Sequence, residues 1–138
     1  MTAAPGEAGS VDGWREGYVA MFGVMPPLPD ARITYLASHD PVALARAEAF
    51  RAVAFGSASL EPKVTQCVLA AALLATGSPA ARWHLLAARR AGATDAELRQ
   101  IVELVATVSA LNAWNIGYAA IAGLDGSEAS DGAVGPPS

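Results

Sequence analysis

The chain has 138 residues, of which 53% are hydrophobic and 16% charged, and its net charge is −4 at pH 7. This composition is too apolar for a disordered chain, and the length favours one folded domain with one core. Basic residues gather nowhere beyond the Arg89-Arg90 pair, which excludes a phosphate-backbone partner, so no nucleic acid is expected. Cys67 is the only cysteine, which excludes a disulfide scaffold, a CxxC redox pair and a cysteine-rich metal site. No metal site is predicted.

The two ends of the chain have similar compositions. Residues 1–12 and 125–138 are rich in Gly, Ser, Ala, Asp and Pro, and we expect both to be flexible tails. The N-terminus also lacks a basic start followed by an apolar run, so it does not read as a signal peptide. The folded domain is therefore expected over residues 13–124, in a cytoplasmic protein.

Between the tails the pattern is helical and no segment alternates in the manner of a half-buried strand, so the fold class is all-α. Asp40-Pro41 is a typical helix start, and Thr94 and Glu97 form a capping box. Prolines in MPPLPD (25–30) break the chain after the first helix. The five helices predicted cover residues 13–23, 41–55, 63–76, 79–91 and 95–122.

The segment 101–124 is apolar enough to be weighed as a membrane span. Glu103, Asn112 and Asn115 lie inside it, however, and alanine is its commonest apolar residue. Polar and charged groups are costly in a bilayer, so a buried helix in a soluble protein is predicted and no membrane partner is expected. A small domain this apolar often hides more surface by association, and a homo-oligomer is expected.

His84 is a candidate for chemistry because the residues on its helix face are small. Positions 77, 80, 81, 88 and 91 on that face are Gly or Ala, which leaves space beside the imidazole for a pocket or for a neighbouring helix. With a pKa near neutral, a histidine in such a space can act as a general acid or base. A core histidine that donates to a carbonyl is the alternative, and the sequence alone leaves both open.

Polar and aromatic residues on other helices are candidates for binding. Asn112 and Asn115 continue the apolar stripe of the last helix, and a buried amide needs a partner because leaving it unpaired costs about 1–3 kcal/mol. That partner is a ligand, the backbone or another subunit. Trp83 and Trp114 are candidates to wall a pocket or to belong to a core or an interface. Cys67 lies on an apolar stripe, where a free cysteine acts as a small hydrophobe.

The order of several short motifs resembles a known family. LEPK at 60–63, an apolar helix, His84, and AGATDAEL at 91–98 with Gly92 eight residues after the histidine are similar to the carboxymuconolactone decarboxylase superfamily, which includes the alkyl hydroperoxidase D-like proteins. The resemblance covers about 14–124. It implies an alkyl hydroperoxidase D-like helical bundle, a trimer or hexamer, and a substrate pocket at His84.

Departures from the family pattern bear on the reaction. The cysteines of the peroxidase-type members correspond to Gly77 and Ala80, so dithiol peroxide reduction is not expected. The acidic relay residue of many members corresponds to Gln66, which cannot act as a base. Ala110-Leu111-Asn112 replaces the Gly-x-Pro of the decarboxylase branch, and Asn115 matches the asparagine that tends to follow it.

The resemblance implies a cofactor-free acid/base enzyme that acts on a small organic acid, lactone or polyketide-like carbonyl compound by decarboxylation, isomerisation or a related proton transfer. His84 would be catalytic. The substrate-binding residues would be Gln66, Trp83, Asn112, Trp114 and Asn115. Two alternatives stay open: a non-catalytic ligand-binding or scaffold protein, and residual peroxidase activity through Cys67.

Overall fold

The computed structural model describes residues 9–131, with side chains to residue 127. Those residues form six α-helices and no strand, which confirms the all-α prediction. The helices are α1 (Val11–Phe22), α2 (Pro27–His39), α3 (Pro41–Phe55), α4 (Pro62–Ala75), α5 (Ala81–Arg90) and α6 (Asp95–Asp131).

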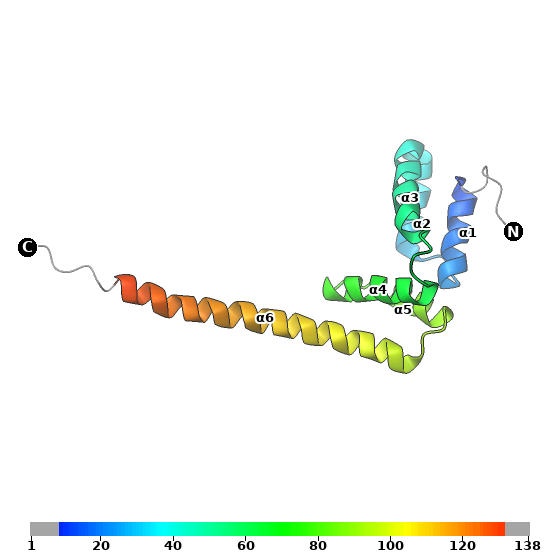
Figure 1. Ribbon diagram of the computed structural model, residues 1–138. Coiled ribbons are helices and arrows are strands. Elements are labelled where there is room, and N and C mark those ends of the chain that lie inside the picture. The colour runs from blue at the N-terminus through cyan, green and yellow to red at the C-terminus, as the bar shows by residue number, and fades with distance from the viewer. Residues whose placement is uncertain (1–8, 132–138) are drawn as a thin grey trace, which may run out of the picture.

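The helices form two groups that run in roughly perpendicular directions (Figure 1). α1, α2 and α3 stand together, while α4 and α5 pack against each other across their lower end, and the start of α6 lies along α4. The core lies where these groups meet, and its buried side chains are Tyr18, Phe22, Ile33, Leu44 and Ala87.

α2 is the helix that the sequence analysis does not predict. The prolines of MPPLPD were expected only to break the chain, yet Pro27 and Pro29 occupy the first turn of α2. The first N–H groups of a helix have no acceptor within it, so a proline there removes no hydrogen bond. Ile33, which is fully buried, then anchors α2 to the core.

Local capping forms as predicted. The Asp40 carboxylate accepts from the Ala43 N–H at 2.9 Å and starts α3. At the start of α6 the Thr94 hydroxyl accepts from the Glu97 N–H at 3.1 Å, and the Glu97 carboxylate accepts from the Thr94 N–H at 2.7 Å. This second bond is the main reason that the pKa of Glu97 is lowered. Gly77 and Gly92, at φ of 70° and 103°, turn the chain after α4 and α5.

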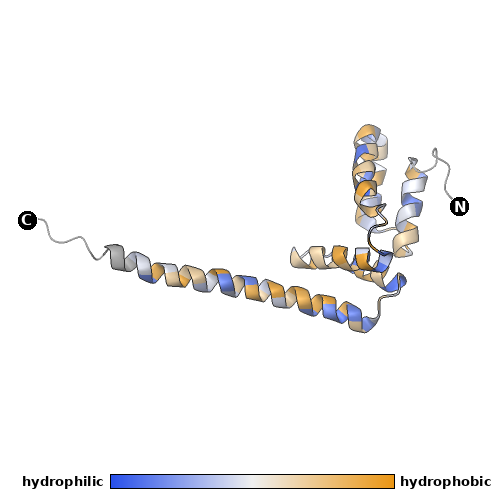
Figure 2. Ribbon diagram, viewed as in Figure 1, coloured by the Kyte–Doolittle hydropathy of each residue, from blue (hydrophilic) through white to orange (hydrophobic). Residues whose placement is uncertain are grey.

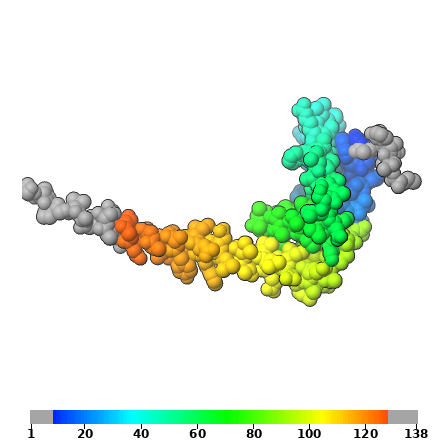
Figure 3. Space-filling view, viewed as in Figure 1, coloured from blue at the N-terminus to red at the C-terminus, as the bar shows by residue number. Residues whose placement is uncertain are grey.

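α6 is longer and more exposed than predicted. Its expected end at residue 122 falls short of Asp131, because no proline interrupts the helix before then and the glycines at 123 and 126 are tolerated within it. Val105 is the last residue of α6 that is partly buried. We call residues 9–105 the head and residues 106–127 the arm. Figures 1 and 3 show the arm leaving the head as a single straight rod.

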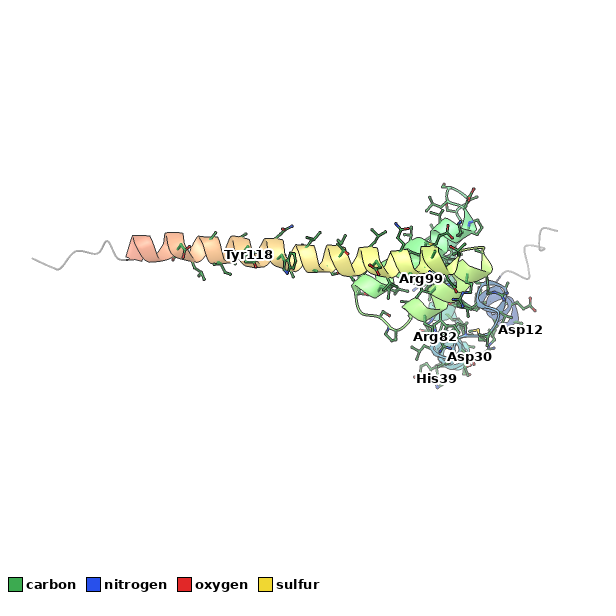
Figure 4. All side chains as sticks on the ribbon, turned by 90° about the horizontal axis from the view of Figure 1, so that it is seen from below. Asp12, Asp30, His39, Arg82, Arg99 and Tyr118 are labelled. Atoms are coloured by element: carbon green, nitrogen blue, oxygen red, sulfur yellow. The ribbon has the colours of Figure 1, made fainter. Side chains whose placement is uncertain are left out.

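Residues 101–124 form a helix as predicted, but the prediction that this helix is buried is wrong for a single chain. Every residue of the arm is exposed, and apolar residues recur along its whole length (Figure 2). Side chains project from the arm on opposite sides, with Tyr118 far along it and Arg99 back at the head (Figure 4). By length and composition alone α6 could cross a membrane, but a single helix of this kind is weak evidence for a span.

Candidate functional site

His84 borders a cavity of about 280 Å³ between α1, α3 and α5. α1 contributes Tyr18 and Phe22, α3 contributes Arg51 and Phe55, and α5 contributes Trp83 beside His84. The Phe22 ring meets the imidazole edge-on at 5.3 Å between centroids, and the Phe55 ring lies at 6.1 Å. The cavity is therefore aromatic, with a few polar groups, as small-molecule sites usually are.

A hydrogen bond between α4 and α5 sets the orientation of the imidazole. His84 Nδ1 lies 2.8 Å from Gln66 Oε1. Since an amide oxygen only accepts, Nδ1 donates and the neutral ring keeps its lone pair on Nε2. Nε2 has no partner in the part of the chain that the structure describes, and no buried side-chain nitrogen there is left unpaired, so Nε2 is open to solvent or ligand.

The surroundings favour the neutral imidazole. Burial lowers the pKa of His84 below its ordinary value of 6.5, and the nearby positive charge of Arg51 lowers it further. Both causes act against the charged form. At neutral pH the ring is therefore a base with a free lone pair, which is the form that accepts a proton.

Arg51 is a site residue that the sequence analysis missed. Its guanidinium lies 4.0 Å from the centre of the Tyr18 ring and 4.5 Å from that of Phe55. Among the described side chains it forms no ion pair, and it donates a weak hydrogen bond to the sulfur of Met21 at 3.9 Å. A half-buried cation held by two rings in a cavity can receive an anion. The signal available in the sequence was an arginine within the apolar C-terminal half of α3.

The head also buries a polar cluster behind the cavity. The Arg32 guanidinium donates to Glu48 Oε1 and to the Tyr18 hydroxyl, both at 2.8 Å, and the Glu48 side chain is only 2% exposed. Burial raises the pKa of Tyr18, and the Glu48 carboxylate raises it further. Tyr18 therefore stays a neutral phenol whose ring supports Arg51.

A model of the carboxymuconolactone decarboxylase family matches residues 41–123, more than half of the chain. The chain belongs to this family. No curated protein and no solved structure gives a significant match. The matched region runs from α3 into the arm and includes Arg51, Gln66 and His84, whereas α1, which supplies Tyr18 and Phe22, lies outside it.

The structure brings together some of the predicted site residues of this family member and separates others. His84 and Trp83 line the same cavity, and Gln66 contacts His84 directly. Asn112, Trp114 and Asn115 lie on the arm, are exposed, and do not line the cavity. If they contribute to a His84 site, they must come from a second copy of the chain.

Gln66 also lines a second hollow, an open groove of about 980 Å³ formed by α1, the segment 56–61, α4 and α5. The residue is buried, with 6% of its surface exposed. Its oxygen accepts from His84, and its amide nitrogen has no partner among the described residues. Gln66 therefore separates the His84 cavity from this groove.

Neither a metal site nor a cysteine is found at the His84 cavity among the described residues. No group of three or more His, Cys, Asp or Glu side chains there could hold a metal ion. Cys67 is partly buried on α4 and is absent from the lining of the His84 cavity.

Proposed function

We propose that the chain is a cofactor-independent enzyme that moves a proton on a small organic acid, lactone or polyketide-like carbonyl compound, with His84 as the general base. The observation that carries this proposal is the bond from His84 Nδ1 to Gln66, which leaves Nε2 free at an aromatic cavity that also holds Arg51. Family membership supports the same kind of chemistry.

The proposed step begins with a carbonyl compound in the cavity. His84 Nε2 takes a proton from the carbon next to the carbonyl, the C–H electrons move to the carbonyl oxygen, and an enolate forms. The imidazolium then returns the proton to the same or another carbon, which gives exchange or isomerisation. In a β-keto acid the same enolate forms when CO₂ leaves with cleavage of the C–C bond, and a proton from water, relayed by His84, completes the product.

Arg51 would stabilise the negative charge. Its guanidinium is half-buried, without an ion-pair partner in the described chain, and held by the Tyr18 and Phe55 rings. A fixed cation in an apolar cavity stabilises an enolate oxygen or a carboxylate more than a solvated one does. It also helps to keep His84 neutral, so the base and the anion-binding group act together.

Gln66 would act through His84. The sequence analysis predicts that Gln66 binds the substrate, and its oxygen accepts from His84 in the structure. We propose Gln66 as a positioning residue that fixes the tautomer and the ring orientation. Trp83 would form part of the apolar wall, together with Phe22.

The test uses ¹H NMR in D₂O with a panel of small β-keto acids, lactones and 1,3-dicarbonyl compounds. The wild-type chain should exchange an acidic C–H for deuterium, or release CO₂, faster than buffer does. His84→Gln should lower that rate at least about 100-fold, since general base catalysis contributes this much or more. His39→Gln is the matched control, because His39 is exposed and its ring only contacts Tyr35 of its own helix.

The outcomes separate catalysis from binding. A compound that shifts Trp83 or His84 resonances but is never exchanged or converted would make the chain a ligand-binding protein. Equal rates for wild type and His84→Gln would remove His84 from the mechanism. Retained peroxide reduction that is lost in Cys67→Ser would favour the cysteine alternative instead.

A further inference from the structure

The arm carries a large apolar surface that the head does not cover. Residues 104–124 contain no charged side chain. Seven large apolar residues of the arm keep between 45% and 68% of their surface exposed; they are Val108, Leu111, Trp114, Ile116, Tyr118, Ile121 and Leu124. With on the order of 100 Å² each, these side chains together approach the ~800 Å² that each partner buries in a standard interface.

One face of the arm carries most of its aromatic and branched side chains, and the face next to it is mostly small. Leu111, Trp114, Tyr118 and Ile121 follow each other at helical spacing, and Asn115 lies among them on the same face. The neighbouring face, roughly 100° around the helix, presents Ala106, Ala110, Ala113, Gly117 and Ala120. A helix that is apolar all round is normally buried.

The head of the same chain cannot cover this surface. α6 is continuous from Asp95 to Asp131, and its glycines keep helical backbone angles, since the positive-φ glycines of the described residues are Gly23, Gly77 and Gly92. No turn is present at which the arm could fold back. Another molecule must therefore cover it.

A lipid bilayer is a poor match for the arm. No lysine or arginine follows Arg99 in the sequence, and the uncharged stretch is bounded by Glu103 and Asp125. Arg89, Arg90 and Arg99 precede the stretch, so the basic residues that usually flank a span on its cytoplasmic side are present, and the charges alone do not decide against a bilayer. Asn112 and Asn115, however, would lie near the middle of such a span, where amides need protein partners.

The head offers a complementary surface in the groove at Gln66. Half of the residues that line this groove are Gly, Ala or Ser, which leaves room for large side chains from outside. Leu60 at the groove is itself half exposed. The amide nitrogen of Gln66 has no partner among the described residues and is not a buried unpaired atom, so it is accessible from the groove and can donate to an acceptor from outside.

We propose that the groove binds the arm of a second copy of this chain, with the bulky face inward and the Asn115 side-chain oxygen accepting from the Gln66 amide. Two chains related by a twofold axis would exchange arms, so that both grooves and both arms are covered in two equivalent contacts. Asn115 would then hold Gln66, and through it His84, in the partner. The arm contact itself does not depend on the proposed function.

Sedimentation velocity of the full chain over a range of concentrations tests the proposal. Wild type should form a dimer or a larger assembly of dimers. Leu111→Lys on the arm and Ala58→Trp in the groove should each raise the dissociation constant at least tenfold, with helix content by circular dichroism unchanged. Val42→Lys is the matched control, because Val42 is 60% exposed on the head and lies outside the groove.

Mixing the two variants locates the contact. A Leu111→Lys chain still has a normal groove, and an Ala58→Trp chain still has a normal arm, so the mixture should form a heterodimer with one intact contact while each variant alone stays monomeric. Failure of the mixture to associate would overturn arm-to-groove exchange in favour of arm-to-arm pairing.

Two further results would also overturn the proposal. One is a wild-type chain that is monomeric at every concentration. The other is a chain that cosediments with phosphatidylcholine vesicles, with or without phosphatidylglycerol, in place of self-association; this would make the bilayer the occupant.

Discussion

The head and the arm are both rich in apolar residues, yet only the head buries them in a core within one chain. The head buries Phe22, Ile33 and Leu44 and encloses the carboxylate of Glu48 with Arg32. The arm leaves Leu111, Trp114 and the other large residues in solvent. A core formed within one chain stabilises its fold at any concentration, whereas the apolar surface of the arm contributes only when a second molecule covers it.

The largest expected effect compares the same substitution in the two regions. Leu44 is 1% exposed and Leu111 is 45% exposed. Leu44→Ala should lower the free energy of unfolding by about 3 kcal/mol, because it removes buried methyl groups and leaves a cavity. Leu111→Ala should change it by less than about 0.5 kcal/mol in protein dilute enough to be monomeric. Urea denaturation followed by circular dichroism measures both.

The effect of Leu111→Ala on stability should depend on protein concentration. At high protein concentration Leu111→Ala should lower the melting temperature relative to wild type, because it weakens the proposed contact between the arm and a second chain. A cost of several kcal/mol for Leu111→Ala in dilute protein would show that the arm packs on its own head.

The next effect concerns charge buried in the head. Glu48→Gln keeps the shape of the side chain but removes the partner of Arg32, and should cost about 2 kcal/mol of folding free energy. Glu16→Gln makes the same change at an exposed position of α1 and should cost almost nothing. Equal denaturation midpoints for the two variants would show that the Glu48 carboxylate is solvated in the folded chain.

Local patterns in the sequence account for much of the head. Asp40 and Thr94 cap helices because the donors they satisfy lie within three residues, so their contacts do not depend on the rest of the fold. The small residues on the helix face of His84 predict either a pocket or a neighbouring helix beside the ring. In the structure Ala81 and Ala88 of that face are buried, and the cavity at His84 is lined mainly by residues of other segments. Helix α2 was missed because the prolines at 25–30 were expected to prevent a helix. A proline breaks a helix only beyond its first turn, and Pro27 and Pro29 lie within the first turn of α2.

Contacts between distant segments were not predictable in this way. Arg51 and Tyr18 are 33 positions apart, and only the packing of α3 against the N-terminal helices makes a ring platform for the guanidinium. The stripe of α6 was read correctly as apolar but assigned to the core of its own chain. A hydrophobic pattern indicates that a face is covered, and it does not say by which chain.

A smaller effect separates the two ends of α6. Thr94→Ala removes the cap at the head end and should cost about 1 kcal/mol. Thr107→Ala, in the arm, removes only a hydroxyl that contacts the carbonyl of Glu103 in its own helix, and should be neutral or slightly stabilising because alanine favours helix. Thermal denaturation of dilute protein should rank the variants in that order. The reverse order would show that the first turn of α6 frays in solution.

The smallest effect is a pH dependence that belongs to the head alone. The pKa of His84 is lowered from 6.5 in the folded chain, so between the folded and the unfolded pKa the unfolded chain binds more protons. The contribution of His84 to stability is therefore fully present above pH 6.5 and declines as the pH falls through that range. His84→Gln should flatten the dependence, measured as the urea midpoint between pH 5 and 7.5. Leu111→Ala should not, because the arm carries no histidine.

NMR titration of the His84 ring separates the two causes of its lowered pKa. Arg51→Met removes the neighbouring charge but keeps the ring buried, so the pKa of His84 should rise and still remain below 6.5. If it does not move, Arg51 lies farther from the imidazole in solution and cannot share an enolate with it. If the wild-type pKa is 6.5 or higher, the ring is largely protonated in slightly acidic buffer, and the case for His84 as a base at this cavity is lost.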